Sequence, residues 1–337
     1  MQQPYQPDLD LLKQALGSHV QECHVELIKT TLPWSLVYRV TLLTQGHSSH
    51  ESVIVKAINP KGLNDPLEAE REPNFYKILY PKINIPKPII HLVTTDRASG
   101  WHMIVMEDLS LTHRIPKHPY QWTRDELRSV LRAYALLHIT NISFSESWLK
   151  PRHESQLDFD AIPQQVAIVQ RAGIWDALPQ LSDLISYARE SCLKYENATI
   201  ALLHNDTTPT NAPLPFDLGP QPAVLIDWQD VGIGMPEMDL AYIDLQPFDS
   251  GRLIPRSELL SHYWHSRAEI EEHIPSPAER TNRQLHADLV MVLWLTRTAS
   301  RVALHPHPEG TYPRMHWDSQ FGIVYNRLKD LAKEINL

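Results

Sequence analysis

The chain has 337 residues, of which 42% are hydrophobic and 21% are charged. This composition is ordinary for a globular protein and excludes disordered, collagen-like and coiled-coil chains, while the length allows about two packed lobes. Forty acidic residues outnumber 31 basic residues, so the formal net charge is -9, and there is no Lys/Arg-rich run. This charge balance argues against nucleic acid or an anionic membrane as a partner.

The sequence also bears on where the protein works. The longest uninterrupted apolar segment, Leu289 to Leu295, is far shorter than the ~20 residues that a membrane span needs, and the first ten residues do not resemble a signal peptide. Cys23 and Cys192 stand too far apart to suggest a disulfide framework. We therefore expect a cytoplasmic protein, and the sequence is compatible with a monomer or a homodimer.

The first third of the chain alternates strand-like and helix-like segments. Polar turns separate apolar runs rich in Val, Ile, Leu and Thr, which predict strands at 20–29, 35–44, 52–58, 89–94 and 102–106. Residues 67–79 have the apolar spacing of a helix, although Pro73 removes one N–H, so that the helix either kinks or begins there. These elements predict a nucleotide-binding lobe over residues 1–108.

Helical patterns dominate after residue 109. Thr123 and Glu126 form a capping-box sequence that opens a helix at 123–139. Further helices are predicted at 163–171, 179–196, 256–271, 279–304 and 316–335, with short strands at 200–203 and 223–226. The predicted fold is therefore α+β and two-lobed, with a five-stranded antiparallel lobe and a larger helical lobe over residues 109–337, joined by a hinge near residues 107–109.

One loop carries the strongest chemical signal. His204, Asp206 and Asn211 follow an apolar segment, and Asp227 ends the next apolar segment. Phosphoryl transfer uses such a set, because one carboxylate orients or deprotonates the attacking hydroxyl while an amide oxygen and a second carboxylate hold Mg²⁺ on the nucleotide phosphates.

With this loop, the sequence resembles the family of aminoglycoside phosphotransferases and choline kinases, small-molecule kinases that share the protein-kinase fold. The resemblance covers most of the chain. Besides the loop, five segments match in order: Val53-Ile54-Val55-Lys56, Glu72-Pro73-Asn74-Phe75-Tyr76, Val105-Met106-Glu107-Asp108-Leu109, Ala135-Leu136-Leu137-His138 and Pro236-Glu237-Met238-Asp239-Leu240-Ala241.

The resemblance implies a role for each matched residue. Asp206 would be the catalytic base, Asn211 and Asp227 would hold Mg²⁺, and Lys56 would contact the α- and β-phosphates. Glu72 would pair with Lys56, although Glu68 and Glu70 lie close enough in sequence to compete. The backbone near Glu107, Asp108 and Leu109 would bind adenine, with ATP as the donor and GTP as a possible one. The acceptor would be a hydroxyl of an aminoglycoside-like, sugar, amino-alcohol or specialised-metabolite molecule.

Other polar residues of the matched segments are expected to be structural. His204 is predicted to brace the catalytic loop and His138 to pack in the core. Asp239 is predicted to anchor the loop by accepting backbone N–H groups.

The sequence also departs from the family pattern. No Gly lies between Gly17 and Gly46, so the turn at 30–35 is not the Gly-rich loop of protein kinases, and Ser35 and Thr31 are candidates to replace it. Thr208 supplies no cation two positions after Asp206. A catalytically silent nucleotide-binding pseudokinase is therefore the alternative. A metal-dependent hydrolase built on His204 and Asp206 is less favoured, because the other histidines lack metal-ligand spacing near that loop.

The charge pattern raises one hypothesis about the acceptor. From Tyr195 through Gly251 the chain has no Lys or Arg but nine acidic residues, which would favour a cationic acceptor. The alternative is that several of these carboxylates cap helices or face solvent. Aromatic residues that could stack on an acceptor or pack in the core are Trp228, Tyr242, Tyr263, Trp264 and Trp294.

Overall fold

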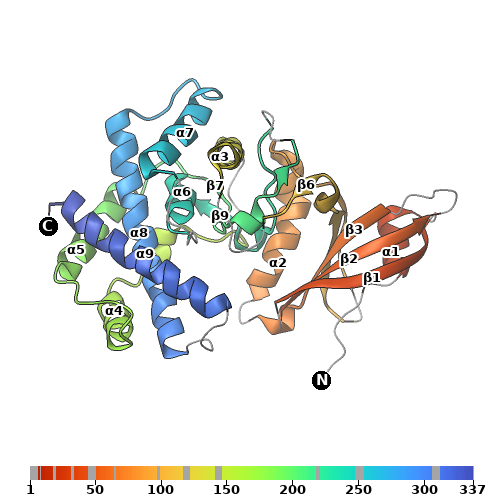
Figure 1. Cartoon of the computed structure of the whole chain (residues 1–337), viewed down its shortest axis with the longest axis horizontal. Helices are drawn as coiled ribbons and strands as arrows, with labels where there is room; N and C mark the ends of the chain where they lie inside the picture. The colour runs from red at the N-terminus through yellow and green to blue at the C-terminus, as the bar shows by residue number, and fades with distance from the viewer. Residues whose placement is uncertain are drawn as a thin grey trace. The chain divides into compact units, whose positions relative to one another are not determined.

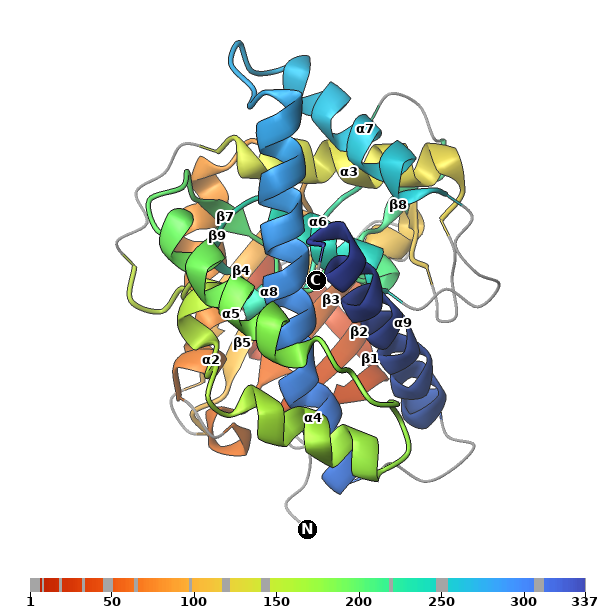
Figure 2. The same ribbon diagram turned by 90° about the vertical axis from the view of Figure 1, so that its left-hand side faces the viewer.

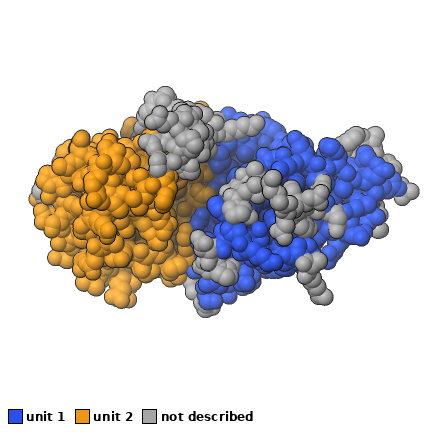
Figure 3. All heavy atoms as spheres, turned by 90° about the horizontal axis from the view of Figure 1, so that it is seen from below, with its two compact units in different colours: residues 1–116, 142–149, 210–231 blue, residues 117–141, 150–209, 232–337 orange. Residues whose placement is uncertain are grey.

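The structure is a computed structural model that describes residues 7, 9–17, 20–31, 34–44, 51–63, 66–96, 99–116, 122–140, 146–217, 221–246, 254–305 and 312–336. Outside what is described lie two of the polar turns that separate the predicted elements, at 46–49 and 64–65, residues 32 and 33 and the side chain of Thr31 in the turn at 30–35, and Asp249, the last of the nine acidic residues in 195–251. The chain divides into two compact units, coloured in Figure 3. Unit 1 comprises Met1–Pro116, Ile142–Leu149 and Thr210–Val231, and unit 2 comprises Lys117–Asn141, Lys150–Pro209 and Gly232–Leu337.

Unit 1 is built on a five-stranded antiparallel sheet (Figure 1). Its strand order is β1-β2-β3-β5-β4, with β1 (Val20–Thr31), β2 (Ser35–Thr44), β3 (Glu51–Ile58), β4 (Ile90–Thr95) and β5 (His102–Glu107). One face of the sheet packs on helix α1 (Leu9–Leu16), which the sequence analysis did not predict. The five predicted strands and their antiparallel arrangement are confirmed.

A β-bulge interrupts β1 near its end. Leu27 pairs with Tyr38, but it is Lys29, two residues later, that pairs with the next residue of β2, Val37. Val37 in turn pairs with Lys56 of β3. Because directly opposed residues on neighbouring strands point to the same face, the bulge aligns Lys29, Val37 and Lys56 on one face of the sheet.

The helix predicted at 67–79 forms in two parts. Helix α2 (Pro66–Asn74) contains Pro73 and continues as a π-helical turn, η2 (Phe75–Leu79). Pro73 has no N–H for the bond that would continue the α-helical ladder, and a wider π turn follows directly. The helix therefore passes through Pro73 and changes its winding after it.

Short elements complete unit 1. They are the 3₁₀ turns η1 (Pro60–Gly62), η3 (Tyr80–Lys82), η4 (Leu109–Leu111) and η7 (Trp228–Asp230), and the paired strands β6 (His113–Arg114) and β8 (Leu214–Pro215), while η6 (Pro209–Asn211) crosses the boundary between the units. The strand predicted at 223–226 is not formed. The Val224 N–H donates to the Pro213 carbonyl and the Ile226 N–H to the Asn211 carbonyl, but Pro213 and Pro215 have no N–H of their own with which to extend this pairing into a ladder.

Unit 2 is mainly helical. Its elements are α3 (Arg124–His138), η5 (His153–Gln156), α4 (Ile162–Arg171), α5 (Leu181–Lys194), β7 (Ala201–Leu203), β9 (Gly232–Gly234), α6 (Glu237–Asp244), α7 (Arg256–Ala268), α8 (Pro277–Leu304) and α9 (Tyr312–Glu334). Helix α8 supplies a large share of the buried core, and α4, α5, α6 and α9 all contact it (Figure 2). The predicted helices are confirmed within a few residues at each end, and the capping box of Thr123 and Glu126 is formed.

Two further findings concern the expected location. No helix in the described ranges combines the length and the apolar character that a membrane span requires. Cys23 and Cys192 are both free thiols.

Candidate active site

The side chain of Lys56 lies at the centre of a charged cluster in unit 1. Its Nζ is 2.6 Å from Oε2 of Glu72 and 2.5 Å from Oδ1 of Asp227. Glu72 is buried, whereas Glu68 and Glu70 are exposed on the same helix, so the structure selects Glu72 among the three candidates. Strand β3 and helix α2 thus bring together two residues of the predicted site with a third that lies 171 positions further along the chain.

Burial and charge act in opposite directions on this cluster. Burial works to lower the pKa of Lys56, but the Asp227 and Glu72 carboxylates outweigh it and raise that pKa above its ordinary value. Burial raises the pKa of Glu72, against the attraction of Lys56. Lys56 is therefore firmly charged, and it is positioned by two carboxylates before any ligand binds.

The backbone around Asp227 is fixed by its neighbour. Asp227 has a left-handed conformation with φ 66°, which is costly for a residue other than glycine and recurs at functional sites. The Trp228 N–H donates to Oε1 of Glu72 at 3.3 Å, and the indole stacks on Phe75 with ring centroids 4.1 Å apart. Trp228 is fully buried, so it is a core residue that holds Asp227 in place and has no surface to offer an acceptor.

Asn211 and Asp227 carry the predicted magnesium ligands, and both belong to unit 1. The Ile226 N–H donates to the Asn211 carbonyl at 3.0 Å, so the backbones beside the two residues are joined. A carboxylate with an amide oxygen is a donor set that suits Mg²⁺. In the described part of the chain no group of three His, Cys, Asp or Glu side chains could hold a metal, so a magnesium ion here would take its remaining ligands from phosphate oxygens and water.

The carboxylates at the predicted hinge have protein partners. Asp108 accepts from Nε of Arg39 and Oγ of Ser52, both at 2.8 Å, and such bonds lower its pKa despite burial. Oε2 of Glu107 accepts from the Ile89 N–H at 3.0 Å. An adenine contact here would therefore use the backbone, as the sequence analysis expects. Ser35 begins β2 and is buried.

Asp206 lies in unit 2, on a loop held by Asp239. Asp239 is fully buried and accepts the N–H groups of His204 at 2.9 Å and Asn205 at 2.8 Å. This confirms the predicted anchoring role of Asp239. Nδ1 of His204, itself fully buried, accepts the Asp206 N–H at 3.3 Å, so His204 braces the loop as predicted.

The loop is also constrained from its other side. Asn205 has a left-handed conformation with φ 63°, which asparagine tolerates better than most residues. Gly232 of β9 lies so close that an added Cβ would be 2.8 Å from Nδ2 of Asn205 and 2.6 Å from the Lys150 carbonyl oxygen. The side chain of Asp206 is half-buried, in contrast with its neighbours His204 and Thr207, which are fully buried.

A buried hydrogen-bond chain, which the sequence analysis missed, supports Asp239. Nε2 of His138 is 3.1 Å from Asp239, and its Nδ1 is 2.8 Å from the Tyr263 hydroxyl. Burial lowers the pKa of His138, so the ring is neutral: Nε2 donates to the carboxylate, and Nδ1 accepts from Tyr263. Arg267 donates to the same hydroxyl at 2.9 Å. The sequence singled out Asp239, His138 and Tyr263 separately, but nothing in it joined them or added Arg267.

Part of the acidic stretch has partners inside unit 2. Glu237 is buried in a two-bond ion pair with Arg283, and Asp244 is buried against Arg256. Asp239 is bonded to His138, as described above. The two arginines come from outside the stretch, so a count of charges along 195–251 overstates the local negative charge at Glu237 and Asp244.

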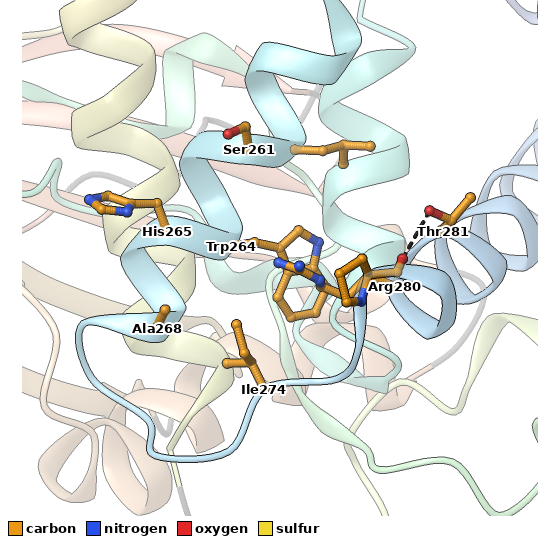
Figure 4. A pocket seen from close by; sticks show the side chains of 9 residues that line it. Ser261, Trp264, His265, Ala268, Ile274, Arg280 and Thr281 are labelled. Atoms are coloured by element: carbon orange, nitrogen blue, oxygen red, sulfur yellow. Dashed lines mark hydrogen bonds between the residues drawn. The ribbon is translucent and has the colours of Figure 1, made fainter.

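Two cavities in unit 2 have none of the predicted catalytic, nucleotide or magnesium residues in their lining, but Trp264 lines one and Trp294 the other, and both are among the aromatic candidates for the acceptor. One, of about 500 Å³, lies where α7 and the start of α8 meet, with Trp264, His265 and Arg280 in its lining (Figure 4). The other, of about 250 Å³, lies between α4 and α8. Its lining combines polar and apolar side chains: Gln156, Leu157, Asp158, Ile162, Gln165, Leu293, Trp294 and Arg297.

The fold is that of the small-molecule kinases. A spectinomycin phosphotransferase solved with ADP and spectinomycin is similar over 95% of this chain and 97% of its own, with 13% identity and a TM-score of 0.56. A microcompartment-associated aminopropanol kinase is similar over 98% of both chains, with 15% identity and a TM-score of 0.56. A GDP complex of an aminoglycoside 2'-phosphotransferase covers 96% of this chain and 99% of its own, with 12% identity and a TM-score of 0.57.

At these identities the structures establish the fold, and a family model establishes the class. Residues 34–270, more than half of the chain, match the model of the phosphotransferase enzyme family. The chain belongs to that family, which confirms the resemblance and the expected enzyme class, a small-molecule phosphotransferase. No curated protein matched the sequence.

Proposed function

We propose that the protein transfers the γ-phosphate of ATP, with GTP as a second possible donor, to a hydroxyl of a small molecule in a magnesium-dependent reaction. Solved structures of the same fold carry ADP or GDP and include an aminopropanol kinase and a spectinomycin phosphotransferase. Residues 1–108 would form the nucleotide lobe and residues 109–337 the catalytic and acceptor lobe. The location is proposed to be cytoplasmic.

The observation that carries this proposal is the position of Lys56 between Glu72 and Asp227, at 2.6 and 2.5 Å. Two carboxylates hold one buried ammonium in place, and such pre-organisation is what a phosphate-binding lysine needs. Lys56 would contact the α- and β-phosphates, while Asn211 and Asp227 would hold Mg²⁺. When bound, the metal would neutralise charge on the β- and γ-phosphates. Ser35 and the backbone at residues 107–109 would contact the nucleotide.

Asp206 would orient the acceptor hydroxyl and accept its proton. The loop that carries it is fixed through Asp239 and His204, so the carboxylate does not have to be ordered when the acceptor binds. Thr208 stands where a cation would otherwise offset transition-state charge, so Lys56 and the metal would supply that charge.

We place the acceptor at the 250 Å³ cavity between α4 and α8. Its wall is linked to the loop that carries Asp206 through two residues, Lys150 and Gly232: Nζ of Lys150 lies 5.7 Å from the ring centroid of Trp294, and the Lys150 carbonyl lies beside Gly232, which is close to Asn205. The lining holds one acidic and one basic side chain, two glutamines and a tryptophan. This set suits a polar acceptor with several hydroxyl or amine groups, and a cationic acceptor would pair with Asp158.

An acceptor screen tests the proposal. The protein is incubated with MgATP or MgGTP and with aminoglycosides, sugars, amino alcohols and specialised metabolites, and mass spectrometry scores the gain of one phosphate. Phosphorylation of any hydroxyl acceptor, lost on omission of Mg²⁺, supports the proposed function. Tight nucleotide binding with no transfer to any acceptor, and no slow hydrolysis of the nucleotide, would instead indicate the silent pseudokinase.

A further inference from the structure

The side chain of Lys29 reaches the charged cluster from a strand that the resemblance does not involve. Nζ of Lys29 lies 3.6 Å from Oδ2 of Asp227, while Lys56 contacts the other oxygen, Oδ1. The two oxygens of the carboxylate that would bind Mg²⁺ are therefore each faced by a different lysine, both within unit 1.

The bulge in β1 creates this arrangement. With regular pairing after Leu27 and Tyr38, Ile28 would oppose Val37 and Lys29 would point to the face that packs on α1. The bulge instead places Lys29 opposite Val37, which lies opposite Lys56 on the next strand. Lys29, Val37 and Lys56 thus form one row across the sheet. Bulges recur beside functional sites because they re-aim one side chain, and here the side chain re-aimed is a cation.

The two lysines are held to different degrees. The Lys56 side chain is 9% exposed and fixed by two carboxylates, whereas Lys29 is 59% exposed and touches Asp227 at the edge of ion-pair distance. An exposed pair of this kind is weak, so Lys29 can leave Asp227 at little cost. Lys29 also precedes the turn at 30–35, where the chain has no glycine to let backbone amides approach phosphates closely.

We infer that Lys29 is a phosphate-binding residue for the nucleotide, which it contacts at the β- and γ-phosphates. This inference rests on the proposed function. Nζ of Lys29 already lies beside an Asp227 oxygen, and a magnesium ion held by that carboxylate would supply positive charge to the terminal phosphates in the same place. When metal and nucleotide arrive, the lysine exchanges the carboxylate for the terminal phosphates and supplies the charge that the phosphate turn lacks.

Calorimetric titration of the full chain tests the inference with ATP, ADP and adenosine as probes. Lys29→Met keeps the length of the stem and removes the charge, Lys29→Arg restores the charge, and Lys77→Met removes an exposed lysine outside the row. We expect Lys29→Met to weaken MgATP binding about tenfold, ADP binding less, and adenosine binding not at all. Lys29→Arg should recover most of the loss, and Lys77→Met should bind like the wild type.

A second titration separates direct contact from an effect through Asp227. In EDTA no metal joins Asp227 to the phosphates, so a direct contact predicts that Lys29→Met still weakens ATP binding. MgATP binding within twofold of wild type, an equal loss for adenosine, or a loss that disappears in EDTA would each overturn the inference. A wild-type protein that binds neither ATP nor GTP would instead refute the proposed function.

Discussion

Gly232 offers a direct test of how the loop that carries Asp206 is held. An added Cβ would lie 2.6 Å from the Lys150 carbonyl oxygen, 0.8 Å closer than the 3.4 Å at which ordinary contact begins, and 2.8 Å from Nδ2 of Asn205. The oxygen belongs to the backbone, which also accepts the Ile233 N–H at 3.0 Å, so it cannot rotate away. In Gly232→Ala, either this pairing or Asn205 must therefore move.

These contacts set the expected losses of stability and of kcat in Gly232→Ala. Forced overpacking of this kind costs about 1–3 kcal/mol of stability. Asn205 adjoins Asp206, and a misplacement of about 1 Å at a catalytic group can lower kcat about a hundredfold. We expect kcat to fall about 10- to 100-fold, with the nucleotide KM nearly unchanged, because Lys56, Glu72 and Asp227 belong to unit 1.

Two other glycines serve as graded controls in kinetics and denaturant unfolding. In Gly234→Ala the nearest atom is the flexible tip of Leu203 at 2.8 Å, so a smaller loss is expected. Gly322 lies in α9 with no heavy atom within 4 Å of its added Cβ, so Gly322→Ala should stabilise by about 0.5–1 kcal/mol. Wild-type kcat and stability in Gly232→Ala would refute the constraint that we derive for the loop.

Three further predictions concern single carboxylates. Asp206→Asn should lose at least about a hundredfold in kcat with nucleotide affinity within about twofold of wild type, since the missing group acts only in the transition state; near-normal phosphorylation would remove its assignment. Asp227→Ala should abolish the magnesium-dependent part of ATP affinity in calorimetry, whereas Asp217→Ala, at an exposed carboxylate, should keep it. Glu154 tests pH dependence: although burial opposes ionisation, bonds from His286 and Arg152 lower its pKa from 4.5 to about 2, so its stabilisation is present above about pH 4.5 and is lost as pH falls towards 2. In Glu154→Gln, the unfolding free energy should fall by about 3 kcal/mol less than in the wild type as the pH is lowered from 4.5 towards 2. An equal fall in both proteins would contradict the assigned bonds.

Several features of this protein could be predicted because their causes are local. The five strands follow from apolar runs broken by polar turns, and the helix at Arg124 follows from a cap and an apolar face within one short segment. The loop motif around Asp206 and the matched segments were likewise readable, because residues that must act together on one loop stay at fixed spacing. For these elements, residues close together in the sequence were enough for a correct prediction.

Other features depend on partners that the sequence does not place nearby. Helix α1 escaped prediction because its short amphipathic pattern gains stability only from the sheet face that it covers. The strand predicted at 223–226 failed because two prolines limit the partner segment. The charge count along 195–251 could not show that Asp244 and Glu237 are paired, because Arg256 and Arg283 lie outside that stretch.

The sequence by itself determined the five strands of the sheet, the long helices and the loop motif around Asp206, since each is encoded by residues close together in the chain, and the family followed from several such segments taken in order. Only the tertiary structure decided that Glu72 is the partner of Lys56, that Trp228 is buried behind Asp227, and that a bulge turns Lys29 towards the same carboxylate. The physical reason is that these contacts join side chains up to 198 positions apart, from Lys29 to Asp227. Strand register and helix phase set such contacts, and a shift of one residue in either would point a different side chain at the site.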